Sequence, residues 1–592
     1  MAYPLPKAFP KMAMSGSTPY FLCSPPNVSR KPEVHSSKIK IIFFLFVTIV
    51  LQFSGCQYEG KGGQKGTQEL ASPNNLSAHL TFLASDHLGG RDTGTPEFEI
   101  AAQYMASQFQ QLGLTPAGDN GSWFQNVPLI RSKVVFNSPK FILYDKNNNQ
   151  ILKLNYPDEF IVRGNPISSN NIIRAPIVFA GYGIVAPSFN HNDYDGLDVT
   201  GKIVAVLNGR PKFFPSEEGA HLAASKLDFA AKLGAVGMIV LSTPDNDRYE
   251  SAKTRAYKQS YDRYNRMDKN GFVAHDPPYS PANPNIKGEA LLSIESSREL
   301  FAAAGKNVQK VFDEINAGNI PAGFELNSQI QLSYKSLHEN LSSPNIIAKL
   351  RGSDNRLAHE SVVFSAHLDH VSPVIKNGVN LIRNGAIDNA LGNAMMIEVA
   401  RLFSIKKASR RSIIFISTTA EEKGLLGSSY FANHPTDSAG QIIANVNLDN
   451  SVLLYPFADV VAFGVEHSSI KKHVTGSVEM FDLTLSPDPV PEMAIFVRSD
   501  HYSFVKQGIP SVFLWPGFKS RDPELSGEKI FKKYFENDYH QPTDNIDLPI
   551  NFDSAALLSN ISYQVSKEIA NDNDTPNWNS GDYFGDIFSK NK

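Results

Sequence analysis

Three apolar runs and one short loop in the second half of the chain each lead directly into a residue that can bind a metal ion or move a proton. The runs precede His367, the adjacent pair Glu421 and Glu422, and Asp449, and the loop carries Asp388. In a parallel α/β sheet, ligands and catalytic groups collect at the carboxyl ends of the strands. This recurrence predicts one composite site in an α/β fold, as in a metalloenzyme.

The individual motifs are weak when each is taken alone. His367 and Asp369 alternate to the same side of an extended segment, so a carboxylate can orient a metal-bound imidazole there. An H-x-D triplet by itself is more often a histidine that is hydrogen-bonded at the end of a strand. Asp388 precedes a helix that we expect to start near Leu391, where a carboxylate serves either as a helix cap or as a bridge between two metals.

The Glu421–Glu422 pair is more informative, because adjacent carboxylates after a buried strand repel each other unless positive charge lies beside them. One of them can face a metal while the other takes a proton from water, as in metal-assisted hydrolysis. A solvated acidic pair in a loop is the alternative.

Two imidazoles and three carboxylates together make a nitrogen and oxygen donor set that suits zinc in a hydrolytic site. These candidate ligands are His367, Asp388, Glu422, Asp449 and His540. Two metal ions that share Asp388 would activate water and polarise a carbonyl at once.

Length and charge set limits on the function. The chain has 592 residues and a formal net charge of -3 at pH 7, so it is long enough for two domains with large cores. It shows neither the basic excess nor the basic blocks of a phosphate-binding surface. We therefore expect no nucleic-acid partner.

Residues 1–56 have the pattern of an export signal. Lys38 and Lys40 precede an apolar stretch from Ile41 to Phe53, which has the length of a signal-peptide core and is short for a membrane span. Small residues then precede Cys56, as in a bacterial lipoprotein signal. A plain cleaved signal and a short membrane anchor are the alternatives.

From this leader we expect an exported protein, periplasmic or at the cell surface, with a lipid anchor at Cys56 and a polar linker at 57–70. Cys23 and Cys56 are the only cysteines. Because both lie outside the mature domain or at its edge, neither a disulfide framework nor cysteine-ligated zinc is expected there.

The mature chain reads as one domain that is split by a β-rich insert. Thr95 and Pro96 predict a helix start, and short strands appear from about Ala175 onwards. The strands that lead into the ligands begin only after Pro344, which indicates an insertion into a loop. The boundaries we predict are 71–165 and 336–570 for the two parts of the outer domain, 166–335 for the insert, and 571–592 for a polar tail.

The ordered series of motifs is similar to a known family, the co-catalytic di-zinc aminopeptidases that carry an inserted protease-associated domain. The motifs include LASDHLGGRDTGTPEF, AGYGIVAP, SAHLDHV, NGAIDNALGNA, TTAEEKGLLGSSYF, NVNLDN, RSDHYSFVKQGIPSVF and YHQPTD. The resemblance runs from about Leu76 to about Lys567. It implies a mixed, mostly parallel sheet that is flanked by helices, of the zinc-exopeptidase type, with a β-rich protease-associated insert.

The resemblance also implies residue roles and a cofactor of two zinc ions. Glu421 would be the general base, and Tyr539 would stabilise the developing oxyanion. Asp369 would not bind a metal ion itself but would orient a ligand. The ligands would be the five residues named above, and a block near the substrate pocket would contain Arg498, Asp500 and His501.

The function we expect is removal of N-terminal residues from peptides with a free N-terminus. A carboxypeptidase or dipeptidase on the same scaffold is the first alternative, and Arg498 is the residue that would bind a substrate carboxylate in that case. A non-catalytic receptor-like binding protein is the second, although the complete ligand set and Glu421 argue against it. Glutaminyl cyclisation with one zinc ion is the third. The oligomeric state is not predicted.

Overall fold

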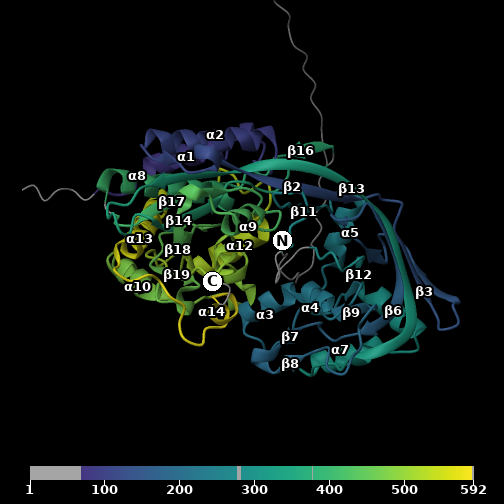
Figure 1. Ribbon diagram of the computed structural model, residues 1–592. Coiled ribbons are helices and arrows are strands. Elements are labelled where there is room, and N and C mark those ends of the chain that lie inside the picture. Colours follow the sequence, from purple (N-terminus) through teal and green to yellow (C-terminus); the bar gives the residue numbers. More distant parts are fainter. Residues whose placement is uncertain (1–68, 276–281, 377, 408, 590–592) are drawn as a thin grey trace, which may run out of the picture. The chain divides into compact units, whose positions relative to one another are not determined.

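The computed structural model describes residues 69–275, 282–376, 378–407 and 409–589 (Figure 1). The leader, Cys56 and nearly all of the linker lie outside these residues. Among the helices in the described part of the chain, none is both long enough and apolar enough to cross a membrane.

The first sheet has four parallel strands at its centre. They run in the order β17 (Ser412–Thr418), β14 (Glu360–His367), β18 (Gln441–Asn447) and β21 (Ser511–Pro516). The flanking strands on either side are β13 (Phe324–Leu350), antiparallel to β17, and β19 (Asp459–Phe463), antiparallel to β21 and parallel to β20 (Thr484–Ser486). The mixed, mostly parallel sheet that we predicted is confirmed.

Helices cover both faces of this sheet because its central strands are apolar on both sides. In β14, Val362 and Phe364 face one core cluster and Val363 faces another. The first cluster includes side chains of α1 (Pro73–Leu83), α2 (Pro96–Gln111), α8 (Leu391–Lys406), α10 (Lys471–Glu479) and α13 (Phe552–Asn571). The second includes those of α9 (Leu426–Asn433) and α11 (His501–Val505).

The predicted helix start at Thr95 is confirmed. The Thr95 side chain accepts a hydrogen bond from the Phe98 amide at 3.2 Å, and Pro96 is the first residue of α2. This cap satisfies an amide that has no partner inside the helix. The helix that we expected near Leu391 is α8, which begins at that residue.

The insert forms a second sheet with a core of its own. Its strands lie in the order β4 (Gln150–Leu154), β3 (Lys140–Tyr144), β13, β6 (Asn170–Phe179), β9 (Ile203–Leu207), β10 (Gly237–Leu241), β12 (Glu289–Leu292) and β5 (Phe160–Ile161). Its helices are α3 (Ser216–Ala224), α4 (Lys226–Lys232), α5 (Tyr249–Tyr257), α6 (Ile294–Ala303) and α7 (Val308–Asn316).

The predicted start of the insert at 166 is corrected to about 140. The strands β3, β4 and β5 belong to the second sheet, and Phe141 and Phe160 pack in its core. The predicted end at 335 agrees with the pairing of β13. Its residues up to Lys335 pair with β6, whereas those from Ser336 to Ile346 pair with β2 (Phe124–Val134) of the first sheet. Figure 1 shows β13 as one long, bent strand common to both sheets.

Four shorter strands and one helix complete the outer domain. The strand β1 (Thr115–Pro116) pairs with β13, and β11 (Arg263–Arg266) pairs with β2. A hairpin of β15 (Val374–Lys376) and β16 (Val379–Leu381) lies between His367 and Asp388 in the sequence. The helix α12 (Gly527–Asn537) ends shortly before His540. In the insert, β7 (Val185–Ala186) pairs with β8 (His191–Asn192).

The segment after 571, which we predicted to be a polar tail, contains the helix α14 (Tyr583–Phe588). The tail prediction missed that Phe584 and Phe588 are spaced to share one helical face, and both are buried. His467 anchors this segment, since its Nδ1 lies 2.5 Å from Asp582 Oδ2 and its Nε2 lies 2.9 Å from Glu217 Oε2. Burial alone would lower the pKa of His467, but the carboxylates of Asp582 and Glu217 raise it to about 9.

This raised pKa predicts a loss of stability at alkaline pH. The protonated form of His467 stabilises the fold fully below its unfolded pKa of about 6.5, and this contribution disappears as the pH rises through about 9. We expect His467→Gln to lower the free energy of unfolding on the order of 2 kcal/mol at pH 6, with a smaller difference at pH 10. Melting temperatures measured across this range test the prediction. His87→Gln, at an exposed histidine, is the control. Parallel curves of melting temperature against pH for His467→Gln and the wild type would contradict the prediction.

Candidate metal centre

The strand ends deliver their candidate ligands to one edge of the first sheet. His367 is the last residue of β14, Asp449 follows β18, and the Glu421–Glu422 pair follows β17. Because β17 and β18 pair in parallel with β14, their carboxyl ends lie side by side. The turn before α8 adds Asp388. The structure therefore brings these residues together, as their shared position after strands predicted.

Two buried groups of potential ligands meet at Asp388. The first, which we call the His367 group, consists of His367, Asp388 and Asp449. His367 Nε2 lies 2.8 Å from Asp449 Oδ1 and 3.3 Å from Asp388 Oδ1. One oxygen of the Asp388 carboxylate thus faces this group.

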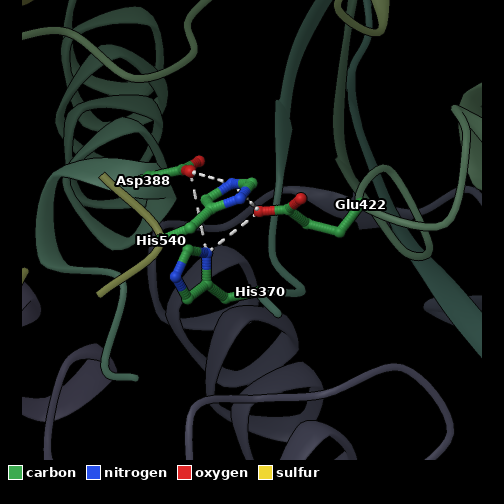
Figure 2. A group of neighbouring side chains, drawn as sticks. All are labelled: His370, Asp388, Glu422 and His540. Atoms are coloured by element: carbon green, nitrogen blue, oxygen red, sulfur yellow. Dashed lines mark ion pairs between the residues drawn. The ribbon is translucent and has the colours of Figure 1, made fainter. Parts of the chain in front are cut away.

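The second group, which we call the His370 group, consists of His370, Asp388, Glu422 and His540. Figure 2 shows the four side chains converging on one another. His540 Nε2 lies 3.0 Å from Asp388 Oδ2 and 2.9 Å from Glu422 Oε1. His370 Nδ1 lies 3.1 Å from Glu422 Oε1. The second oxygen of Asp388 therefore faces this group.

His370 is the one member of the two groups that the sequence analysis missed. We used the alternation of an extended strand, which places His367 and Asp369 on one side and residue 370 on the other. The strand ends at His367, however, and His370 lies beyond it in an isolated bridge with Asp92, where the alternation of β14 no longer applies. The signal that could have found His370 is the second histidine of the SAHLDH motif.

The charges of the two groups depend on one another. Burial alone would lower the pKa of His367, but the carboxylate of Asp449 raises it well above its usual range. Burial would likewise lower the pKa of His540, but Glu422 and Asp388 raise it to about 9. Burial and Glu422 would raise the pKa of Asp388, yet the two histidines lower it. The carboxylates here thus require positive charge beside them.

The donor set fits metal ions. Zinc ligands lie about 2.0–2.1 Å from the ion, so neighbouring ligands in a tetrahedral shell lie roughly 3.3 Å apart. The nitrogen-to-oxygen distances within the groups run from 2.8 Å to 3.7 Å. Among the described residues, four buried atoms have no partner in hydrogen-bond geometry, namely both ring nitrogens of His370, Nε2 of His540 and Oε1 of Glu422. Buried polar atoms normally have partners, so these atoms are suited to hold an ion.

Neighbouring residues fix the positions of the ligands by hydrogen bonds. His367 Nδ1 donates to the backbone carbonyl of Asp369 at 3.0 Å. This differs from our prediction, in which the Asp369 carboxylate orients the imidazole. The carboxylate instead accepts hydrogen bonds from the amides of Glu421 at 3.0 Å and Glu422 at 3.3 Å, and so holds the loop that carries both glutamates.

Two further supporting residues escaped the sequence analysis. Ser499 donates to Asp449 Oδ2 at 2.6 Å. Asp544 accepts from the amides of Ile387 at 2.9 Å and Asp388 at 3.2 Å, and from the Tyr534 hydroxyl at 3.1 Å. Hydrogen bonds of this kind fix the orientation of metal ligands.

Glu421 and Tyr539 lie beside the two groups without belonging to either. Among the described residues, no partner hydrogen-bonds the Glu421 carboxylate, and burial together with nearby carboxylates raises its pKa well above the usual range. Tyr539 stacks on His540 with their ring centroids 3.9 Å apart. Burial and the carboxylates of Asp388 and Glu422 raise the pKa of Tyr539 well above its usual value, so its hydroxyl keeps its proton.

The block that we expected near the substrate pocket divides in two. Arg498 is half-buried, and its Nη1 donates to the Met493 carbonyl at 3.4 Å. Asp500 and His501 are both fully buried. Asp500 accepts a hydrogen bond from Thr418, and His501 packs between aromatic rings. Their place near the substrate pocket stays a prediction, because burial does not distinguish them from the ligands, which are also buried.

Comparison with known families identifies the class of protein. Residues 345–565 match the model of Peptidase family M28, and residues 173–268 match the model of the PA domain. The chain therefore carries a region of peptidase family M28 and, before it in the sequence, a PA domain. The family resemblance drawn from the motifs is confirmed.

Individual relatives match part of their length. Probable leucine aminopeptidase 2 of Aspergillus fumigatus is 27% identical over 262 residues, which cover 43% of this chain and 47% of the relative. Aminopeptidase NAALADL1 of Mus musculus is 26% identical over 310 residues, which cover 47% of this chain and 38% of the relative. The chain thus spans less than half the length of these relatives.

Solved structures resemble the chain over most of its length. An aminopeptidase from Aneurinibacillus sp. strain AM-1 has 18% identity and a TM-score of 0.48, and the match covers 86% of this chain and 98% of that chain. BSAP, a zinc aminopeptidase from Bacillus subtilis, has 18% identity and a TM-score of 0.41, and covers 85% and 96%.

Asp544 provides a test of how the turn at Asp388 is held. Its removal leaves two buried amides and a buried hydroxyl without their acceptor. We expect Asp544→Ala to destabilise the metal-free protein on the order of 3 kcal/mol, and to weaken metal binding about 10- to 100-fold. Thermal unfolding and competition with a chelator measure the two effects. Asp547→Ala, at an exposed aspartate in the same loop, is the control. Wild-type metal affinity in Asp544→Ala would contradict the prediction.

Proposed function

We propose that this protein is an exported, zinc-dependent aminopeptidase that uses two zinc ions to hydrolyse the N-terminal bond of peptides. The observation that carries the proposal is the Asp388 carboxylate, whose two oxygens face two separate buried groups of nitrogen and oxygen donors. The region of peptidase family M28 and relatives named leucine aminopeptidase support a peptide substrate with a free N-terminus.

The ligands fit the proposed ions by type and number. The His367 group and the His370 group would each hold one ion, with Asp388 as the shared ligand. Zinc held in this way supplies Lewis-acid polarisation of a carbonyl and lowers the pKa of water. The remaining work falls to side chains of this chain.

Glu421 is placed to move the proton. Its carboxylate is nine-tenths buried and carries no hydrogen bond among the described residues, while its amide is tied to Asp369. A carboxylate held in this manner can accept a proton from the attacking water and return it to the leaving amine. Glu422, its neighbour, faces His540 instead. The pair thus divides between proton transfer and ligation.

Tyr539 is placed to donate a hydrogen bond to the oxyanion that forms during attack. Its ring is held against His540, and its hydroxyl keeps its proton at all ordinary pH values because the pKa is raised. A donor that is fixed before the reaction stabilises developing negative charge most effectively.

A peptide panel tests the activity and the role of Glu421 together. We expect the wild type to release amino acids from aminoacyl-anilides in a zinc-dependent manner and to leave N-blocked peptides intact. Glu421→Gln should lower kcat about 1000-fold, because general-base catalysis contributes roughly 10²- to 10⁴-fold. Bound metal should stay unchanged, and Glu479→Gln, at an exposed glutamate, should be fully active.

Other outcomes of this panel identify the alternatives. Cleavage from the C-terminus would indicate a carboxypeptidase or dipeptidase, with Arg498 as the group that binds the substrate carboxylate. Cyclisation of N-terminal glutamine would indicate a cyclase. Metal binding without turnover of any substrate would indicate a receptor-like protein and would contradict the proposal.

Export and lipidation are part of the proposal and rest on the leader at 1–56. The basic residues, the apolar stretch and the small residues before Cys56 support lipid attachment at that cysteine. We expect wild-type protein in the membrane fraction of a bacterial host and Cys56→Ser in the soluble fraction or the unprocessed precursor. Cys23→Ser is the matched control. Equal membrane association of both variants would argue for a membrane anchor without lipid.

A further inference from the structure

The two ligand groups differ in size. The His367 group offers three protein ligands, whereas the His370 group offers four. We propose that His370 is a metal ligand in its own right and that it completes the coordination shell of the ion in its group. This inference deepens the proposed function, on which it rests, by assigning different tasks to the two ions.

The position of the His370 ring supports ligation. The ring is fully buried, and its Nδ1 lies 3.1 Å from Glu422 Oε1 and 3.7 Å from Asp388 Oδ2. Its centroid lies 5.4 Å from that of His540, with the rings nearly perpendicular. Figure 2 shows both imidazoles directed toward the same two carboxylates. The two distances from Nδ1 to the carboxylate oxygens are close to the spacing expected between ligand atoms of one zinc ion, about 3.3 Å.

A purely structural histidine would look different. A buried imidazole normally donates from one ring nitrogen and accepts at the other, since an unsatisfied polar atom is costly in the interior. In the described part of the chain Nε2 of His370 has no hydrogen-bond partner, and the contact of Nδ1 with Glu422 Oε1 at 3.1 Å lacks the geometry of a hydrogen bond. An ion at Nδ1 satisfies the nitrogen that faces the two carboxylates.

The chain holds His370 in place from two sides. The His370 amide donates to the Arg91 carbonyl at 3.3 Å. The Arg91 guanidinium is itself buried and donates to the carbonyls of Leu368 at 2.8 Å, Asn384 at 2.7 Å and Gly385 at 3.0 Å. It therefore connects the loop that carries His370 to the turn that carries Asp388. A ligand fixed in this way loses little conformational entropy when it binds an ion.

The backbone at Gly385 also lies close to the His370 ring. A Cβ atom at Gly385 would lie 2.6 Å from Cγ of His370, and Gly385 has a φ of +57°. Only glycine allows the ring to lie against the backbone here. The ring is thus confined between this backbone and the carboxylates.

A four-ligand shell and a three-ligand shell suit different tasks. Zinc sites with four protein ligands are closed and hold the ion for structure, whereas catalytic sites keep one position for water or substrate. The three-ligand His367 group therefore keeps an open position, whereas the four-ligand His370 group retains its ion more tightly.

Cobalt substitution in the full-length protein tests whether residue 370 is a ligand. We expect His370→Cys, loaded with Co²⁺, to show a thiolate-to-cobalt charge-transfer band in the near ultraviolet. His370→Ala is the matched control, because it retains the two native cysteines and lacks the new thiol. A protein that fails to fold would not give a stoichiometric band, so the gain of signal separates ligation from unfolding.

Competition with a chelator tests the asymmetry. We expect the wild type to bind two Zn²⁺ ions with unequal affinity, and His370→Ala to raise the dissociation constant of the tighter ion at least about 100-fold, since loss of a residue behind a ligand already costs roughly 10- to 100-fold. Asp449→Asn should weaken mainly the other ion.

The combined results distinguish the role of His370 from the proposed function and from the assignment of tasks to the two ions. Two bound ions in the wild type, with no band in His370→Cys and unchanged tight binding in His370→Ala, would overturn the role of His370 and leave the proposed function intact. Failure of the wild type to bind zinc would overturn both. Loss of the tighter ion in Asp449→Asn instead of His370→Ala would overturn the assignment of tasks.

Discussion

The structure of the site depends on one carboxylate that is shared between two clusters. Asp388 Oδ1 faces His367 and Asp388 Oδ2 faces His540, so both groups lose a ligand if this side chain moves. Glu422 and Asp449 bring two further carboxylates into the same buried space, where like charges repel strongly. Without cations, protonated His367 and His540 balance part of this negative charge, which is why their pKa values are raised. Cations replace those protons as the source of positive charge.

The fold holds this carboxylate by means of backbone contacts from distant segments. Asp544, from the loop after α12, accepts hydrogen bonds from the two amides of the turn at Asp388. Arg91, from the loop before α2, donates hydrogen bonds to the two carbonyls that precede this turn. The strands β14, β17 and β18 bring the other ligands to the same edge because they run in parallel. The central sheet thus brings the ligands to one edge, and hydrogen bonds from the loops fix the position of Asp388 there. A site assembled in this manner is rigid before any ion binds.

Much of this arrangement could be predicted from the sequence. The parallel strands and the gathering of His367, Glu422 and Asp449 follow from apolar runs that end in polar residues. Asp388 and His540 lie on loops and follow from no such run. His370 could not be placed, because strand alternation stops where β14 ends. Nor could the sequence show that α11 buries His501 among aromatic rings. The start of the insert was also missed, because β3 pairs with the distant strand β13 and β4 pairs with β3, and such long-range pairing has no local signal.

Glu421 connects the electrostatics of the site to its chemistry. Burial and the carboxylates of Asp449 and Glu422 raise its pKa well above the usual range, so in the absence of cations it holds a proton and cannot act as a base. Positive charge at the His367 group would favour the ionised form of Glu421. The same carboxylate crowding that attracts cations therefore keeps the base inactive until they are present. In the proposed mechanism, occupancy of the three-ligand group therefore frees Glu421 to accept a proton, and the four-ligand group keeps Asp388 and Glu422 in place.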